Sequence, residues 1–268
     1  MSRNIKKLFM INKIFVSGGS QCIAGGFVHD NVKKVYKENL NINISNNLDF
    51  AYPNILAKKL GVDIINEGAS GGSITRMIRK TYEYIINNKK DINETLFIFE
   101  VPPGWREEYY SNELKRHVNM TIGNIYSPAD ETDAANGHNP RDIFKIHKDI
   151  SNFFYNFIDD DLHKTKMMMN LLGLMSFIKL NKLNYILNDT GDFDTFLSRN
   201  NLERDYNFVW FSDKFEYPMW QWAVEQKLLI KNETNGLSND EHMGIKANEL
   251  MATKLYNMLN NINDKKLL

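Results

Sequence analysis

Short apolar runs alternate along the chain with longer segments in which apolar residues recur at helical spacing. The strand-like runs are residues 13–17, 62–66, 95–101, 183–187 and 206–211. The helical segments are residues 51–60, 73–86, 167–180 and 244–259. Parallel strands need long crossover connections, and helices commonly provide them. The pattern therefore predicts an α/β fold with a parallel sheet.

Glycine-rich or polar turns follow the first three predicted strands. Gly18-Gly19-Ser20 follows the first, a turn that contains Gly68, Gly71 and Gly72 follows the second, and residues 102–107 follow the third. The carboxyl ends of parallel strands lie at one edge of a sheet, where ligands bind. We therefore expect Ser20, Gly71 and residues 102–107 to lie near one another.

Residues 111–163 do not fit the alternation of strands and helices. No low-complexity linker separates them from the rest of the chain, so we predict one domain over residues 1–268, with this segment as an insertion over the carboxyl edge of the sheet. Long insertions at that edge commonly shape access to a site.

Charge and cysteine content exclude several classes of protein. The 33 basic and 33 acidic residues give a net charge of zero, so no overall field attracts nucleic acid or an anionic membrane. The single cysteine, Cys22, excludes internal disulfides and multi-thiolate zinc sites, and suits a reducing compartment. The N-terminal apolar run is interrupted by Lys13, and no run is long enough for a membrane helix. We expect a cytoplasmic protein that binds neither nucleic acid nor membrane.

Ser20 and His242 are the candidates for nucleophilic catalysis. A serine on a glycine turn after a strand presents its hydroxyl at the sheet edge; alternatively, Ser20 caps the next helix. His242 precedes the last predicted helix, with Asp240 two residues before it. A histidine oriented by a carboxylate can accept the proton of a serine hydroxyl. The two ends of the chain thus supply a possible Ser-His-Asp set.

Three segments resemble the sequence blocks of the SGNH, or GDSL-like, serine hydrolases. Residues 15–20 (FVSGGS) resemble strand-Gly-Asp-Ser, with Gly19 in place of Asp; residues 66–73 (NEGASGGS) resemble the second block; residues 239–242 (NDEH) resemble Asp-x-x-His. The blocks occur in the family's order. The resemblance implies a three-layer α/β/α sandwich with a five-stranded parallel sheet.

The same resemblance assigns roles to residues. It implies that Ser20 is the nucleophile, that His242 is the general base, and that the N–H groups of Ser20 and Gly71 bind the oxyanion. Asn66, which opens the second block, and Asn239 are predicted on the oxyanion and substrate side of the site. No metal and no organic cofactor is implied.

The chain departs from the family pattern at two places. The third block normally supplies an asparagine, but residues 100–107 read EVPPGWRE. Arg106 could replace that asparagine as a cationic donor, or could pair with Glu107 or Glu108 at the surface. In the last block Asn239 occupies the usual acid position, and Asp240 is one residue closer to His242. Since only a carboxylate stabilises an imidazolium by its charge, we predict Asp240 as the acid.

Other residues are given structural roles. Cys22 is predicted to be a small buried side chain rather than a thiolate nucleophile. His138, His147 and His163 match no metal-ligand spacing with Asp159, Asp160 and Asp161, which we interpret as a solvated acidic turn. The aromatic residues between Trp210 and Trp222 are assigned to the core, with one or two at a cleft rim suited to stacking on a sugar.

The sequence favours a serine esterase that hydrolyses small acyl esters, such as O-acetyl groups on a carbohydrate. Its partner would then be a small-molecule or glycan ester. Two alternatives use the same fold: a binding or structural protein with an impaired site, such as a virion or glycan-binding component, and an acyltransferase. A flavodoxin-like nucleotide binder is a weaker alternative, because it would need a basic residue at the glycine turns, and none occurs there before Arg76.

Overall fold

The computed structural model describes most of the chain. The described residues are 11–69, 71–102, 106–112, 115–121, 160–188, 209–210 and 219–265. Within them, no helix has both the length and the apolar character needed to cross a membrane.

A parallel sheet forms the centre of the fold. Its strands, in spatial order, are β2 (Asp63–Asn66), β1 (Lys13–Gly18), β3 (Thr95–Glu100), β6 (Asn184–Asn188) and the short β7 (Val209–Trp210). Every pairing between these neighbours is parallel. The predicted α/β class with a parallel sheet is confirmed. The strand expected at residues 206–211 is described at residues 209 and 210.

In the described part of the chain, helices lie between β1 and β2, between β2 and β3 and between β3 and β6, and three more follow β7. The α-helices are α1 (Asp30–Leu40), α2 (Tyr52–Leu60), α3 (Ile74–Asn87), α6 (Asp160–Leu180), α9 (Met219–Glu225), α10 (Ile230–Glu233) and α11 (Ile245–Lys265). The 3-10 helices are η1 (Gln21–Ile23), η2 (Gly25–Val28), η3 (Asn47–Phe50) and η4 (Ile92–Glu94).

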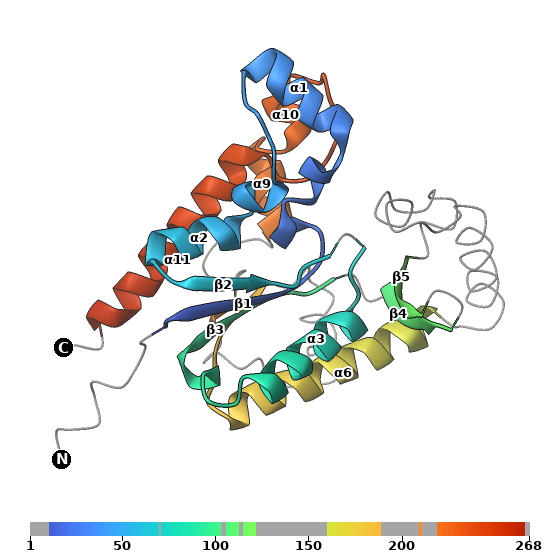
Figure 1. The fold of residues 1–268 in the computed structure, drawn as a ribbon, viewed down its shortest axis with the longest axis vertical. Coiled ribbons are helices and arrows are strands. Elements are labelled where there is room, and N and C mark those ends of the chain that lie inside the picture. Colours follow the sequence, from blue (N-terminus) through green and yellow to red (C-terminus); the bar gives the residue numbers. More distant parts are fainter. Residues whose placement is uncertain are drawn as a thin grey trace.

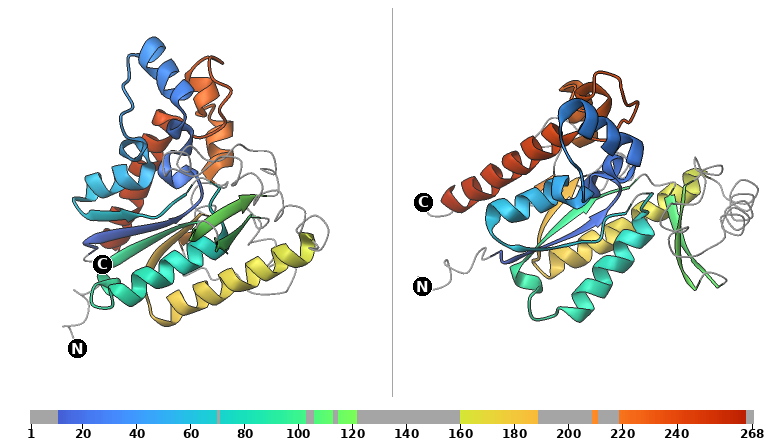
Figure 2. Two further views of the ribbon diagram at one scale, coloured as in Figure 1. Left: turned by 45° about the vertical axis from the view of Figure 1, so that its right-hand side comes forward. Right: turned by 45° about the horizontal axis from the view of Figure 1, so that its top comes forward.

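Successive residues of the central strands face opposite sides of the sheet, and both sides are buried. Ile14 and Val16 lie in an apolar cluster that α2 and α11 complete. Phe15 lies in a second cluster that α3 and α6 complete, and its ring stacks on Tyr84 with centroids 4.4 Å apart. Figures 1 and 2 show α2 and α11 over one face and α3 and α6 over the other. Burial on both faces explains why the strands read as continuous apolar runs.

Helix α6 already includes Asp160, seven residues before the predicted helix at residues 167–180. Residues 160–166 (DDLHKTK) contain few apolar residues, so apolar spacing does not reveal them. The expectation of an acidic turn was therefore wrong for Asp160 and Asp161, which are helical.

The structure also contains elements that the apolar pattern did not predict. Helix α1 carries only a narrow apolar stripe, with Val32 and Tyr36 buried. An antiparallel hairpin of β4 (Arg106–Ser111) and β5 (Arg116–Thr121) lies beside the first turns of α3 (Figure 1). The interruption of the α/β alternation thus begins at Arg106, and α6 has begun by Asp160. Most of the predicted insertion at 111–163 lies outside the described residues.

A third apolar cluster joins the region after β1 to the segment before α11. Phe27 of η2 and Tyr36 of α1 pack there with Ile230 of α10. The Tyr36 hydroxyl donates a hydrogen bond of 2.7 Å to Glu233, whose carboxylate also accepts from the first backbone N–H groups of α11. These contacts bring together the two parts of the chain that carry Ser20 and His242.

Candidate active site

The carboxyl ends of three neighbouring strands bring the predicted site residues to one edge of the sheet. In register, Gly18 of β1 is level with Glu100 of β3, and Val16 is level with Asn66 of β2. Ser20 follows Gly18 by two residues. The turns after these strands therefore start from one region of the sheet edge, as the parallel arrangement requires.

The Ser20 side chain points at His242. Ser20 Oγ lies 3.0 Å from Nε2 of His242, although the two residues are 222 positions apart. The backbone carbonyl of Ser20 accepts hydrogen bonds from the N–H groups of Ile23 and Gly25, which closes a tight turn. Ser20 stands at the N-cap position of η1, but its side chain makes no capping hydrogen bond there, unlike the alternative in which the serine serves to cap the next helix.

His242 is held from its other side by Asp240. The Asp240 Oδ1 atom lies 2.8 Å from His242 Nδ1 and also accepts from the His242 backbone N–H at 2.8 Å. Burial acts to raise the pKa of Asp240, but the hydrogen bonds from His242 outweigh it and leave that pKa below its usual value. Of the two residues considered as the acid, Asp240 makes this contact, whereas Asn239 is exposed.

Backbone contacts fix the His242 loop against the rest of the fold. The His242 carbonyl accepts from the N–H of Ile230, and Met243 pairs with Leu229 in an isolated β-bridge. The Met243 N–H donates to the side-chain oxygen of Gln21, the residue after Ser20, at 3.2 Å. The turn that carries Ser20 is thus tied directly to the loop that carries His242.

A glycine pair that sequence analysis overlooked lies against this group. A Cβ added to Gly25 would stand 2.6 Å from Ser20 Cβ and 3.3 Å from His242 Nε2. A Cβ added to Gly26 would stand 2.8 Å from Asp240 Oδ1. Only glycine lets η2 approach so closely. In the sequence, the Gly-Gly pair that starts five residues after Ser20 could have indicated this close approach.

The turn after β2 supports the site through its backbone. Its Ala69 N–H donates to the Gly18 carbonyl at 3.2 Å, and Gly71 has a φ of 65°, which favours glycine. The two hydrogens of the Asn66 amide are directed to the Cys22 carbonyl at 2.7 Å and to Asn54 Oδ1 at 2.9 Å. In this geometry the side-chain amide of Asn66 braces the turn.

Arg106 lies on the Glu100 side of the Ser20 turn. A Cβ added to Gly19 would stand 3.8 Å from Arg106 Nη1 and 2.9 Å from Glu100 Oε1. Burial lowers the pKa of Arg106, and the Glu100 charge opposes this effect. Arg106 was expected to bind substrate or to pair with Glu107 or Glu108; the carboxylate whose charge acts on it is that of Glu100.

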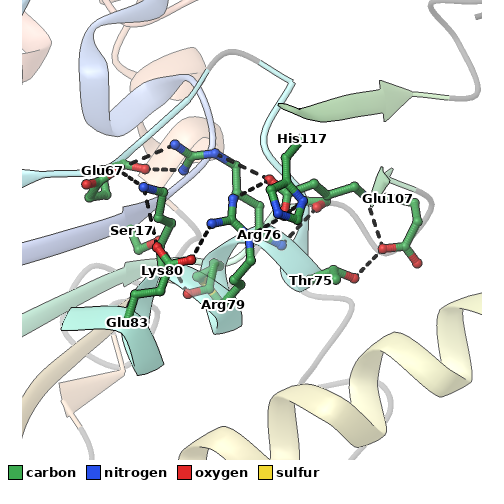
Figure 3. A network of polar contacts seen from close by, with 12 residues as sticks. Ser17, Glu67, Thr75, Arg76, Arg79, Lys80, Glu83, Glu107 and His117 are labelled. Atoms are coloured by element: carbon green, nitrogen blue, oxygen red, sulfur yellow. Dashed lines mark hydrogen bonds and ion pairs between the residues drawn. The ribbon is translucent and has the colours of Figure 1, made fainter. Parts of the chain in front are cut away.

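Glu107 and Glu108 instead anchor the hairpin to α3, in the network drawn in Figure 3. Glu107 accepts from the Thr75 hydroxyl, and Glu108 accepts two hydrogen bonds from Arg79, both of 2.8 Å. Arg76 lies 3.6 Å from Glu67, in the turn after β2, and 3.9 Å from Glu108 of β4. The network therefore joins α3 to both segments that flank the site.

We expect the Arg79→Met variant to lose about 3 kcal/mol of unfolding free energy, because it removes the close partner of a buried carboxylate. The Glu108 side chain is 3% exposed, and its remaining basic neighbours, Arg76 and His117, are 3.9 and 3.4 Å away. Urea unfolding of both proteins measures the loss. Glu83→Gln is the control, because Glu83 is exposed and also pairs with Arg79. This variant should lose at most about 0.5 kcal/mol of unfolding free energy. Equal losses in the two variants would contradict the prediction.

We expect the stability of the wild-type protein to depend on pH through Glu100. Burial raises the pKa of its carboxyl from 4.5 to about 7. Between these values the folded protein keeps a proton that the unfolded chain releases, so the free energy of unfolding falls as pH rises, by about 3 kcal/mol in all. Glu100→Gln has no such carboxyl and should lack this fall. Urea unfolding of both proteins from pH 4 to 8 measures it, and parallel curves would contradict it.

The remaining predicted residues have structural positions or lie outside the described residues. Cys22 is fully buried, as predicted, and its thiol donates to the Gly19 carbonyl at 3.1 Å; burial raises the pKa of that thiol. Trp222 is buried, also as predicted. His163 lies 3.8 Å from Glu107. Outside the described residues are His138, His147, Asp159, Phe211, Phe215 and Tyr217.

No group of three metal-binding side chains occurs among the residues for which the structure gives positions. At Ser20, hydrogen bonds link a hydroxyl, an imidazole and a carboxylate in that order. Such a chain can move a proton from the hydroxyl to the imidazole while the carboxylate holds the ring.

Comparison with known sequences gives a family. A model described as a family of unknown function, DUF6071, matches residues 42–255. The chain belongs to this family. The DUF6071 match includes Asp240 and His242 and starts after Ser20. No curated protein matches the chain.

Solved structures similar to this DUF6071 chain include two with low sequence identity. One is a protein assigned to the lipolytic G-D-S-L family from Desulfitobacterium hafniense DCB-2, with 11% identity, a TM-score of 0.40, and coverage of 92% of this chain and 98% of that one. The other is the psychrotrophic esterase EstA from Pseudoalteromonas sp., inhibited by monoethylphosphonate, with 12% identity, a TM-score of 0.44, and coverage of 94% and 99%.

Proposed function

We propose that this chain is an SGNH-like serine esterase, built as a three-layer α/β/α sandwich on a five-stranded parallel sheet. The observation that carries the proposal is the continuous chain of hydrogen bonds from Ser20 Oγ through the His242 ring to Asp240, with lengths of 3.0 and 2.8 Å. Acyl transfer through serine needs three parts: a nucleophile, a base in contact with it, and a group that orients the base.

In the first half of the reaction, Ser20 Oγ attacks the carbonyl carbon of the ester while His242 Nε2 accepts the hydroxyl proton. The carbonyl oxygen becomes an oxyanion, which the N–H groups of Ser20 and Gly71 and the guanidinium of Arg106 would stabilise. The bond to the alcohol oxygen then breaks, and His242 returns the proton to that oxygen. Ser20 is left as an acyl ester.

In the second half, a water molecule attacks the acyl-serine carbonyl and His242 accepts a proton from the water. Breakdown of the second tetrahedral intermediate releases the carboxylic acid and returns the proton to Ser20 Oγ. Asp240, next to Nδ1, would stabilise the imidazolium formed in each half. Small acyl groups such as acetate on a carbohydrate remain our substrate class, which rests on the family resemblance.

The test is whether Ser20 is a reactive nucleophile. Purified protein is incubated with a fluorophosphonate, and the modified residue is located by fragmentation mass spectrometry; turnover of p-nitrophenyl acetate is followed in parallel. We expect phosphonylation at Ser20 together with loss of turnover. Ester turnover without modification, or modification at Ser17 or another serine, would count against the proposal, and the absence of both reactions would favour a binding protein.

A further inference from the structure

Glu100 is a buried acid next to the turn that carries Ser20. It ends β3, level with Gly18, and only 6% of its surface is exposed. Its Oε1 atom accepts a hydrogen bond of 3.3 Å from the backbone N–H of Gln21, the residue after Ser20. The carboxyl therefore holds the first peptide group beyond the proposed nucleophile.

The glycines before Ser20 make room for this side chain. A Cβ added to Gly18 would stand 2.6 Å from Glu100 Cβ, and a Cβ added to Gly19 would stand 2.9 Å from Glu100 Oε1. Real Cβ atoms do not approach other atoms this closely without something moving. The carboxyl thus occupies the space that a side chain at position 19 would enter.

Glu100 and Arg106 approach the same point from two strands. Arg106 Nη1 lies 3.8 Å from a Cβ added to Gly19, and the Glu100 charge attracts the guanidinium. The other carboxyl oxygen, Oε2, is buried and has no hydrogen-bond partner among the described residues. Burying a carboxyl with one oxygen unsatisfied costs free energy, so stability alone would favour an apolar residue here.

We propose that Glu100 is a positioning residue of this site, which holds the Ser20 turn through the Gln21 N–H and directs Arg106 to the side of Ser20. The inference rests on the proposed function, because it assigns Glu100 to the same reaction. Glu100 acts through Gln21 and Arg106 and does not itself contact the ester. Position 19 is a glycine, and the acid beside the Ser20 turn comes from the neighbouring strand β3.

Moving the carboxyl from Glu100 to position 19 of the turn tests this directly. The variants are Glu100→Gln, which keeps an acceptor for the Gln21 N–H but removes the charge, Glu100→Ala, and the double variant Gly19→Asp with Glu100→Ala. Phosphonylation rate at Ser20, kcat and KM are measured at a temperature where unfolding curves show every protein folded. Glu107→Gln is the control, since Glu107 is another buried acid, from the next strand along the chain.

We expect kcat and the phosphonylation rate to fall about 10-fold in Glu100→Gln and about 100-fold in Glu100→Ala, with KM nearly unchanged, because misplaced groups slow the chemical step. The Gly19→Asp substitution in the double variant should restore at least about 10-fold of that loss, whereas Glu107→Gln should stay within about 2-fold of wild type.

The outcomes separate this inference from the proposed function. If wild-type Ser20 is not phosphonylated, the proposed function fails and the role of Glu100 fails with it. If wild-type Ser20 reacts and both single Glu100 variants react as fast as wild type, only the positioning role of Glu100 is overturned. The same holds if the Gly19→Asp substitution restores none of the rate lost in Glu100→Ala.

Discussion

Replacement of either Ser20 or His242 by alanine is expected to lower kcat for p-nitrophenyl acetate by about 10⁴- to 10⁶-fold, and the double variant should be no slower than the slower single variant. The reason is that the hydroxyl and the imidazole act as one unit. The hydroxyl is a weak nucleophile unless Nε2, 3.0 Å away, accepts its proton, and without the hydroxyl the imidazole has no proton to accept.

The control for the histidine is His29→Gln. His29 is an exposed histidine near the site, and it has no part in the proposed proton transfer. The kcat of His29→Gln should stay within about 2-fold of wild type, since solvent and salt screen an exposed side chain. Losses that multiply in the double variant would show that Ser20 and His242 act independently and would contradict the shared mechanism.

Asp240→Asn is expected to lower kcat by about 10⁴-fold while the protein stays folded. An asparagine oxygen can still accept from the His242 backbone N–H, which the Asp240 oxygen does now at 2.8 Å, so the loop should keep its shape. The amide carries no charge to stabilise an imidazolium, and it can stabilise the wrong tautomer of the ring. The pH profile of kcat and the melting temperature together distinguish a chemical effect from unfolding.

Glu241→Gln is the matched control for this variant. Glu241 follows Asp240 directly but is exposed, and it pairs with Lys231 at 2.6 Å. Its kcat should stay within about 2-fold of wild type, as is usual for an exposed ion pair. A loss in Asp240→Asn no larger than in Glu241→Gln would mean that the Asp240 charge is not used.

The local sequence was enough to predict the strands of the sheet, because an apolar run can be recognised without knowing which residues it contacts. The runs at Lys13 and Thr95 are apolar on both faces, which suits a covered parallel strand, and the structure contains β1 and β3 there. Helix α1 was missed because its apolar stripe is narrow, and the hairpin because its strands carry charged residues that pair with α3. Both elements are stabilised by contacts with the rest of the fold, which apolar spacing along the chain does not reveal.

Sequence reasoning could also name Ser20, His242 and Asp240, since each stands in a recognisable context next to a turn or helix. It could not show whether Asp240 or Asn239 contacts the imidazole. Nor could it show that the Glu100 charge acts on Arg106. Chain spacing says nothing about which side chains meet after folding. Gln21 and Glu100 are 79 positions apart and Ser20 and His242 are 222 apart, yet each pair is in hydrogen-bond contact.

The sequence by itself thus determined the α/β class, the strands whose ends form the edge, and the residue types available there. Only the tertiary structure decided which of them touch: the imidazole on the Ser20 hydroxyl, the carboxyl of Glu100 in the space beside Gly19, and the Asn66 amide turned to the backbone. The physical reason is that periodicity along a chain reports burial, whereas hydrogen bonds depend on distances that the packing of the layers sets.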